Sequence, residues 1–331
     1  MAIDLHAHWV PQALADALRQ RRGRAPFIER VGGGGERLVM PIGSLAFHAQ
    51  YVEPGWRLEF MERHGIERQV LSLPGLFGVD SLPLAEAAPL VRLFNDACAQ
   101  LCREQPKRFS AFAALPLADM AAAAAELRWA RQQPGCVGAI LPVDSFLSVE
   151  KAAHLAPLFE LGAALGVHFF VHPGRGPGSE ALPPPSADHD LARRALAVQH
   201  EVGQAMVTLL LSDFLDPWPG LTVHVANLGG TFPAVVERMD EVVRLRDPGA
   251  PLPSSRARRV WVDCSSLGPR ALEQAVAVFG ADRVVLGTDC PIFDTGATLA
   301  AIRAARLSSQ EREQILEANA RALLEGRLVH E

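Results

Sequence analysis

The chain has 331 residues, of which 49% are hydrophobic, 21% are charged and 6% are aromatic. This composition excludes intrinsic disorder, and the length allows either two ordinary domains or one large α/β barrel. The formal net charge is −5, and no basic stripe with interleaved aromatic residues is present, so nucleic acid is not an expected partner.

Histidine is frequent and lysine is rare in this sequence. There are 11 histidines but only two lysines, Lys107 and Lys151. The five cysteines form no CxxC pair, so we expect reduced thiols in the core of a cytoplasmic protein. The first residues lack the pattern of a signal peptide, and no stretch approaches the roughly 18 consecutive apolar residues of a membrane span. We therefore expect no association with a membrane.

Eight short apolar or β-branched runs, each followed by Gly, Pro or a polar residue, are predicted strands. They cover residues 3–9, 69–74, 109–115, 138–142, 168–173, 222–228, 260–265 and 283–290. Helical spacing predicts helices at residues 84–105, 118–132, 150–165, 191–211, 232–246 and 269–279. This alternation predicts parallel strands joined by crossover helices, and eight such units predict a (β/α)8 TIM barrel, in the α/β class.

A doubly wound open sheet is the alternative fold. Its first strand would usually lead into a glycine-rich phosphate loop, but His-Ala-His stands there, so the barrel is favoured. We predict one domain over residues 1–331, with an insertion at residues 10–56 that folds over the barrel mouth. Residues 174–187 form a second long loop on the same side, and residues 307–328 are predicted closing helices.

Side chains that can bind a metal end three of the predicted strands. His6 and His8 are two residues apart in the first strand, so both face the barrel interior. His172 ends the fifth strand and Asp289 ends the eighth. Alone, each residue has an ordinary structural explanation as a hydrogen-bonded core histidine or a turn cap. Together, three imidazoles and a carboxylate suit a divalent ion such as Zn²⁺ with one position left for water or substrate.

With these motifs the chain resembles the amidohydrolase superfamily, in the branch that contains aminocarboxymuconate-semialdehyde, resorcylate and carboxyvanillate decarboxylases. The resemblance runs nearly end to end. Its motifs are Asp4-Leu5-His6-Ala7-His8, Glu53-Pro54-Gly55-Trp56-Arg57, Asn95-Asp96, Pro106-Lys107-Arg108-Phe109, Val171-His172-Pro173, Leu228-Gly229-Gly230-Thr231-Phe232-Pro233 and Leu286-Gly287-Thr288-Asp289-Cys290-Pro291. It implies that His6, His8, His172 and Asp289 hold one divalent metal ion, commonly zinc and in some members manganese.

The scarcity of lysine favours a single metal ion. Members of the superfamily with two metals generally bridge them with a carboxylated lysine at the end of the fourth strand. The predicted fourth strand, residues 138–142, contains no lysine, and both lysines of the chain lie outside it.

Residue 227 departs from the pattern of the branch. Its decarboxylases typically carry an acid–base histidine before the Gly-Gly turn, and Asn227 stands at that position. Asparagine can donate or accept a hydrogen bond but cannot take up a proton near neutral pH, so we expect Asn227 to position substrate. His224 is three residues away and has the opposite parity, so in a regular strand it points toward the helices; a bulge would reverse this.

Three further residues are candidates for substrate binding. Arg238 matches an arginine that binds a substrate carboxylate in the semialdehyde decarboxylase, where a neighbouring subunit contributes it; the branch commonly forms homodimers. The other carboxylate-binding arginine of that enzyme falls on Leu45, which favours a different acidic substrate here. Arg175 could pair with an anionic substrate, and His48 could enter the pocket. For all three, a solvated surface residue is the alternative, and Glu201 is expected to be structural.

Two reactions fit these residues. The resemblance favours non-oxidative decarboxylation of an aromatic or unsaturated carboxylic acid, with Asp289 relaying a proton. The alternative is metal-dependent hydrolysis of a lactone, ester or amide, with Asp289 as general base. A barrel that binds a metal or a small acid without turnover is the third hypothesis.

Overall fold

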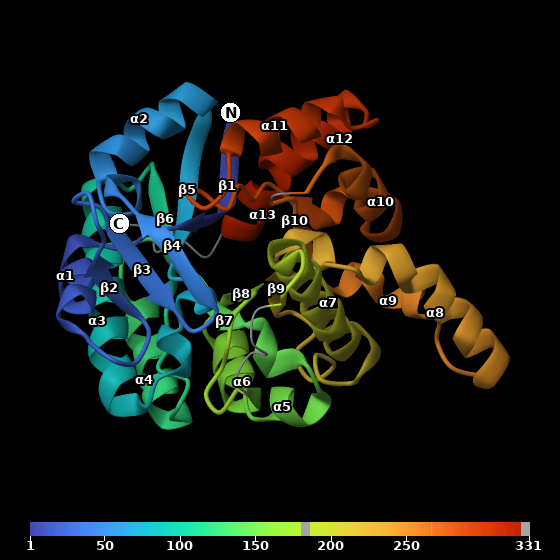
Figure 1. Ribbon diagram of the computed structural model, residues 1–331. Helices are drawn as coiled ribbons and strands as arrows, with labels where there is room; N and C mark the ends of the chain where they lie inside the picture. Colours follow the sequence, from blue (N-terminus) through green and yellow to red (C-terminus); the bar gives the residue numbers. More distant parts are fainter. Residues whose placement is uncertain (180–185, 266, 326–331) are drawn as a thin grey trace.

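The computed structural model describes residues 1–179, 186–265 and 267–325. Eight parallel strands follow one another around a barrel in chain order (Figure 1). They are β1 (Ala2–His8), β5 (Ile66–Ser72), β6 (Phe109–Ala113), β7 (Cys136–Pro142), β8 (His168–His172), β9 (Thr222–Val225), β10 (Trp261–Asp263) and β11 (Val284–Val285). Each lies within or overlaps one of the predicted runs, so the predicted TIM barrel is confirmed.

The barrel closes between β1 and the segment that follows β11. Regular pairing of the last strand covers only Val284–Val285, which is shorter than predicted. The chain then runs on beside β1: the Leu5 N–H donates to the Leu286 carbonyl at 2.9 Å, the His8 N–H donates to the Cys290 carbonyl at 2.7 Å, and Ala7 pairs with Cys290. The first and last strands are thereby joined.

Helices cover the outside of the barrel (Figure 1). They are α2 (Pro54–His64), α3 (Leu84–Glu104), α4 (Met120–Arg131), α5 (Val149–Ala153), α6 (Ala156–Ala164), α7 (Asp190–Leu211), α8 (Phe232–Arg246), α9 (Pro253–Arg256), α10 (Pro269–Phe279), α11 (Thr295–Ala304), α12 (Ser309–Glu313) and α13 (Asn319–Leu324). The helix predicted at 150–165 is split in two, and Pro157 lies in the first turn of α6, where its missing N–H costs no hydrogen bond. The closing helices end within the described residues; residues 326–328 of that prediction lie outside them.

Apolar side chains from the strands fill the barrel interior. One buried cluster contains Leu5, Val70, Phe112, Ile140, Phe170 and Val285, which come from six different strands. A packed interior is the usual arrangement in a barrel of eight strands, and it leaves the C-terminal ends of the strands as the place for a site.

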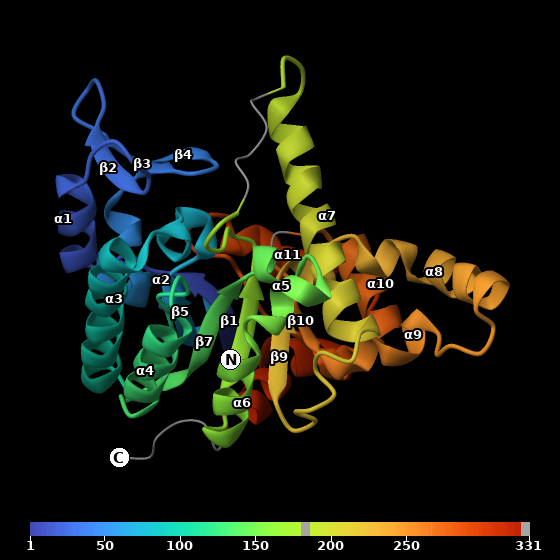
Figure 2. The same cartoon turned by 90° about the horizontal axis from the view of Figure 1, so that it is seen from below.

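Residues 10–56 contain a small unit of their own. Helix α1 (Gln12–Gln20) is followed by β2 (Phe27–Arg30), β3 (Glu36–Met40) and β4 (Gly43–Phe47), which form an antiparallel sheet, and by the short helix η1 (Ala49–Tyr51). The Val10 N–H donates to the Tyr51 carbonyl at 2.9 Å, which ties the end of this unit to the end of β1. In Figure 2 its sheet and the first half of α7 project on the same side of the molecule.

Within the described part of the chain, none of the helices is long and apolar enough to cross a membrane.

Candidate metal centre

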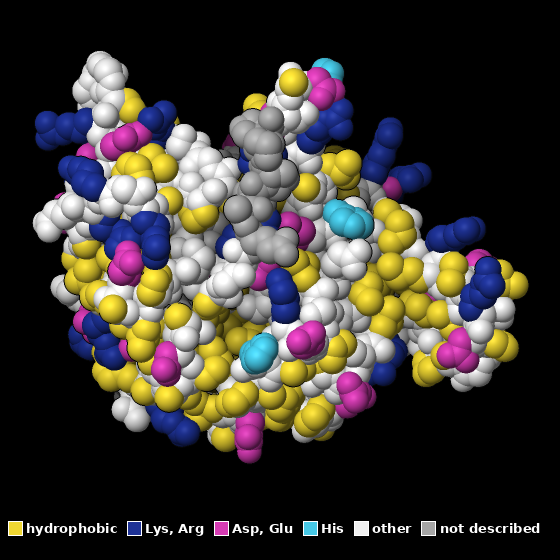
Figure 3. All heavy atoms as spheres, turned by 60° about the horizontal axis from the view of Figure 1, so that its bottom comes forward, with side chains coloured by type: hydrophobic (Ala, Val, Ile, Leu, Met, Phe, Trp, Pro, Cys, Tyr) yellow, Lys and Arg dark blue, Asp and Glu magenta, His cyan; other side chains and the backbone are white. Residues whose placement is uncertain are grey.

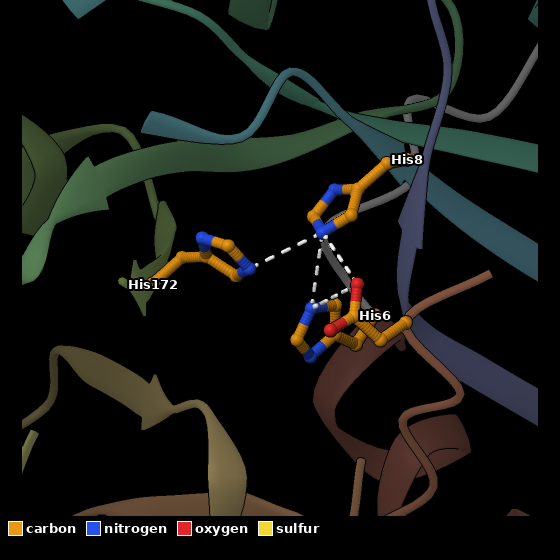
Figure 4. A group of neighbouring side chains, drawn as sticks. His6, His8 and His172 are labelled. Carbon is orange, nitrogen blue, oxygen red and sulfur yellow. Dashed lines mark hydrogen bonds and ion pairs between the residues drawn. The ribbon is translucent and has the colours of Figure 1, made fainter. Parts of the chain in front are cut away.

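The four predicted ligands lie together where β1 and β8 end and where the segment after β11 runs beside β1, and all are buried. The Nε2 atom of His8 lies 3.2 Å from Nε2 of His6 and 3.2 Å from Nε2 of His172. It also lies 3.1 Å from Oδ1 of Asp289. One donor atom from each of the four residues lies within 4.8 Å of the donor atoms of the other three. Figure 4 shows the three labelled imidazoles directed toward one another.

Each imidazole is held by an oxygen atom on its other side. Nδ1 of His6 lies 2.9 Å from Oδ2 of Asp263, and Nδ1 of His172 lies 2.7 Å from the Pro173 carbonyl. Nδ1 of His8 lies 3.0 Å from Oγ of Ser72, whose own hydroxyl donates to the Ala7 carbonyl at 3.2 Å. A carbonyl or carboxylate only accepts, so these contacts place the proton on Nδ1 and leave the Nε2 lone pairs facing the centre.

This arrangement of lone pairs fits a cation. Three Nε2 atoms and the Oδ1 atom of Asp289 would repel one another without a positive charge between them. Oδ1 of Asp289 is buried and has no hydrogen-bond partner among the described residues. Burying an unpaired carboxylate oxygen is costly, so the residues present match a divalent ion with three imidazole ligands and one carboxylate ligand.

The charges around the centre differ in their effect on each ligand. Burial holds the pKa values of His8 and His172 well below the ordinary range of histidine, so both rings are neutral, as ligation requires. Burial also lowers the pKa of His6, but the charges of Asp263 and Asp289 outweigh it and raise this pKa to about 9. Burial raises the pKa of Asp289 above its usual value.

A buried network of polar side chains holds the backbone next to the candidate ligands His8 and Asp289. Oδ1 of Asp4 accepts from the Thr288 N–H at 3.0 Å, and Oδ2 accepts from the Thr288 hydroxyl at 2.7 Å. Gln69 donates to Asp4 at 2.8 Å and accepts from Arg57 at 3.1 Å. Arg57 is fully buried and also donates to the His8 carbonyl at 2.5 Å. This network fixes the backbone that carries His8 and the turn that carries Asp289.

Asp289 occupies a special backbone position. Its φ is 56°, in the left-handed region, and its N–H donates to the His6 carbonyl at 2.8 Å. Two residues earlier, a Cβ atom on Gly287 would lie 2.7 Å from Cγ of Asp263. Glycine at residue 287 therefore leaves the room that the partner of His6 occupies.

Asn227 lies beside this centre but not at the end of a regular strand. Strand β9 ends at Val225, and Asn227 begins the short helix η5 (Asn227–Gly229) with a left-handed φ of 57°. Its Oδ1 accepts from the Ser265 hydroxyl at 2.7 Å, and its N–H donates to Oδ1 of Asp263 at 3.3 Å. Its side-chain nitrogen has no partner among the described residues.

His224 does not point toward the helices, so the expectation from strand parity was wrong. Its ring stacks on Phe170 with centroids 4.0 Å apart, inside the barrel, and its Nδ1 lies 2.8 Å from Nε2 of His168. Alternation holds only within a regular strand, and the chain leaves it before Asn227, so Asn227 gives no information about the direction of His224. Burial lowers the pKa of His224 to about 3, which leaves the ring neutral.

The three predicted substrate-binding residues lie outside the metal cluster. Arg175 pairs with Asp144 at 3.5 Å and with Glu201 at 3.1 Å. His48 is exposed and borders a cavity of about 620 Å³ within the insertion. Arg238 is exposed on α8. The central part of the loop at 174–187, residues 180–185, lies outside the described residues.

Sequence reasoning did not find the partners that orient the ligands. Asp263 and Ser72 bind the ring nitrogens of His6 and His8, and Asp4 holds Thr288. One signal was available for Asp263 and Ser72. Each is a polar residue near the C-terminal end of a predicted strand, on the side of the barrel where active sites lie.

The sequence profile of the amidohydrolase family matches residues 3–326. The chain belongs to this family, as its motifs predicted. Among relatives, the gamma-resorcylate decarboxylase of Rhizobium radiobacter is 30% identical over 298 residues, covering 82% of this chain and 87% of the relative. The 2-amino-3-carboxymuconate-6-semialdehyde decarboxylase of Dictyostelium discoideum is 26% identical over 302 residues, covering 88% and 82%.

Solved structures show the same fold. The 2,6-dihydroxybenzoate decarboxylase from Rhizobium is 25% identical, with a TM-score of 0.72 over 98% of each chain. The dihydroxybenzoic acid decarboxylase from Polaromonas is 22% identical, with a TM-score of 0.71 over 98% of this chain and 96% of that one. The latter structure contains manganese and the inhibitor 2-nitroresorcinol.

Proposed function

We propose that this protein is a metal-dependent carboxy-lyase that removes carbon dioxide, without oxidation, from an aromatic or unsaturated carboxylic acid. The observation that carries the proposal is the convergence of three imidazole Nε2 atoms and the Asp289 carboxylate in one buried cluster. The similarity to decarboxylases over more than four fifths of the chain supports this reaction over others of the family.

His6, His8, His172 and Asp289 would hold one divalent ion. Such an ion would polarise a substrate oxygen as a Lewis acid and stabilise negative charge that develops on it. We propose zinc because three imidazoles and one carboxylate are typical zinc ligands, with manganese as the alternative that metal analysis would distinguish.

The protein residues then have to manage one proton. Loss of carbon dioxide breaks the bond between the carboxyl group and the substrate carbon and leaves an electron pair on that carbon. This electron pair must then form a C–H bond with a proton. We assign delivery of this proton to Asp289, because its second carboxylate oxygen stays available when Oδ1 faces the metal position. The side chain of Asn227 does not ionise near neutral pH, so we assign it the role of orienting substrate through its side-chain amide.

We further propose that the protein acts as a homodimer joined through α8. Three apolar side chains on this helix are exposed, Val235 at 39%, Val242 at 46% and Leu245 at 74%. With Arg238 they follow the i, i+3, i+7, i+10 spacing of one helical face. Helix α8 projects from the barrel, and Figure 3 shows hydrophobic and basic side chains together on this projection. A second copy seated there would bury the apolar face and carry Arg238 toward its partner's site.

The roles of Arg175 and His48 and the cellular location remain predictions, and each has its own support. The two ion pairs of Arg175 favour a structural role for it over substrate binding. We propose that the insertion covers the barrel mouth and that the whole chain forms a single domain. His48 belongs to this insertion, so it would contact substrate only if the insertion lies over the mouth. The five free, buried cysteines support a reducing, cytoplasmic location.

Turnover assays test the proposed reaction. The metal-loaded protein is incubated with a panel of hydroxybenzoates and with simple lactones, and both carbon dioxide and released acid are measured. Carbon dioxide from the hydroxybenzoates is the expected result. Acid released from the lactones would assign the protein to the hydrolases instead, and neither product despite bound metal would identify a binding protein.

A further inference from the structure

Tyr51 is the only tyrosine in the chain, and it lies near the end of the insertion, where the backbone returns to the end of β1. Its ring stacks on Phe47, with centroids 5.4 Å apart at 19°, and contacts Phe77 with centroids 6.5 Å apart. Phe77 lies in turn 6.5 Å from the ring of His8. One aromatic ring therefore separates Tyr51 from a metal ligand.

The backbone holds Tyr51 in this place. It ends η1, its N–H donates to the His48 carbonyl at 3.0 Å, and its carbonyl accepts from Val10, two residues after His8. The side chain has little freedom to leave, since the residue is only 4% exposed.

The hydroxyl group of Tyr51 is the one part of this side chain that could form a hydrogen bond and does not do so in the described part of the chain. No hydrogen bond to this hydroxyl is formed within the described residues, although a buried tyrosine hydroxyl usually has a partner. Its oxygen is also not sealed off, unlike the buried unpartnered oxygens of Thr295 and Thr298. The Tyr51 hydroxyl is therefore free to donate a hydrogen bond to a small molecule bound near it.

The electrostatic surroundings keep this hydroxyl protonated. Burial, with the charges of Asp289 and Cys290, raises the pKa of Tyr51 to about 12. Tyr51 can therefore donate a hydrogen bond at any physiological pH but cannot act as a base.

We propose that the Tyr51 hydroxyl donates a hydrogen bond to a carboxylate or phenolate oxygen of the acid bound at the centre formed by His6, His8, His172 and Asp289. This inference rests on the proposed function and adds a substrate-contacting residue to it. It makes the insertion part of the substrate site, because the insertion supplies the donor. It also makes the site selective for ligands with a charged oxygen on the side of Tyr51.

Binding calorimetry on the full-length, zinc-loaded protein tests the proposal, with 2,6-dihydroxybenzoate as the probe. Tyr51→Phe keeps the ring and removes only the hydroxyl, so we expect affinity to fall about tenfold or more while zinc content stays at that of the wild type. The matched control is Thr298→Val, which removes another buried hydroxyl and should leave affinity unchanged. Equal affinity of Tyr51→Phe and the wild type would overturn the inference and leave the proposed function standing. Absence of binding to the wild type would overturn both.

A single tyrosine permits a second, direct measurement. Protein labelled with 3-fluorotyrosine gives one ¹⁹F resonance, from residue 51. We expect this resonance to shift when 2,6-dihydroxybenzoate is added to the zinc-loaded protein and to stay in place with 1,3-dimethoxybenzene, which has no charged oxygen. A resonance that ignores the acid while calorimetry reports binding would contradict the contact.

Discussion

Oδ2 of Asp263 lies 2.9 Å from Nδ1 of His6, and both side chains are fully buried. The charge of His6 outweighs the effect of burial and holds the pKa of Asp263 below its usual range, so the carboxylate stays ionised. An ionised acceptor fixes the His6 tautomer and increases the basicity of Nε2, which faces the metal position.

Replacing this carboxylate should weaken metal binding. We expect Asp263→Asn to lower zinc affinity by about 10- to 100-fold, measured by competition with a chelator. The control is Ser265→Ala, because the Ser265 hydroxyl contacts Asn227 and no ligand. Unchanged affinity in Asp263→Asn would show that His6 needs no charged partner.

Removal of the metal should destabilise the fold as well as abolish turnover. The four proposed ligands come from β1, β8 and the segment after β11, so an ion bound by them would join both sides of the barrel closure. At a free metal concentration about 100 times the dissociation constant, binding contributes about 2.7 kcal/mol to the free energy of unfolding. Thermal unfolding should therefore occur at a lower temperature after dialysis against dipicolinate and recover with zinc. In His172→Ala, added zinc should produce a much smaller increase.

Asn227 should be tested with a glycine substitution. Its φ of 57° is tolerated by asparagine and glycine, whereas alanine would add backbone strain. We expect Asn227→Gly to reduce kcat by tenfold or more while the protein retains its zinc, which atomic absorption would verify. Loss of zinc from this variant would assign Asn227 to the support of Asp263 instead. Asn227→His, which restores the residue typical of the decarboxylases that the motifs resemble, should retain more activity than the glycine variant.

Asp80 should make stability depend on pH. It lies in η3 (Val79–Ser81), it is 2% exposed, and burial raises its pKa from 3.8 to about 7. Between these values the folded protein holds a proton that the unfolded chain releases, so the free energy of unfolding should fall by about 1.4 kcal/mol per pH unit from this group. Asp80→Asn should remove that decrease and be more stable than the wild type at pH 8. Urea unfolding at several pH values, with exposed Asp213→Asn as control, measures the difference.

A charged residue introduced on the exposed apolar face of α8 should disrupt the proposed dimer. Leu245→Glu should shift the protein from dimer to monomer in sedimentation velocity experiments, because it places a carboxylate in the proposed interface. Val149→Glu, on another exposed apolar residue, should leave the sedimentation coefficient unchanged. A wild type that sediments as a monomer at micromolar concentration would exclude the dimer.

The barrel and the clustering of the four candidate ligands were predictable because each follows from a local pattern. Alternating strands and helices gave the eight units, and the two-residue period of a strand placed His6 and His8 on one face. The position of each ligand at the end of a strand then brought His172 and Asp289 to the same end of the barrel. These inferences need no knowledge of how distant side chains pack.

Contacts between distant residues were not predictable in the same way. Asp263 is 257 residues from His6, and no periodicity links them. The direction of His224 was predicted wrongly because a left-handed residue ended the strand earlier than its apolar pattern indicated. The place of Tyr51 depends on how the insertion folds back on β1, which its sequence does not specify locally.

The closure of the barrel also sets the order in which the metal centre can form during synthesis. His6 and His8 leave the ribosome long before Asp289, which lies in the segment that pairs with β1. Until that segment emerges, only the three imidazoles of the four candidate ligands are present, and the edge of β1 that Leu286 and Cys290 later cover stays unpaired. The four candidate ligands thus come together only in the finished barrel, and an ion held by all four would stabilise the fold only after the chain has closed.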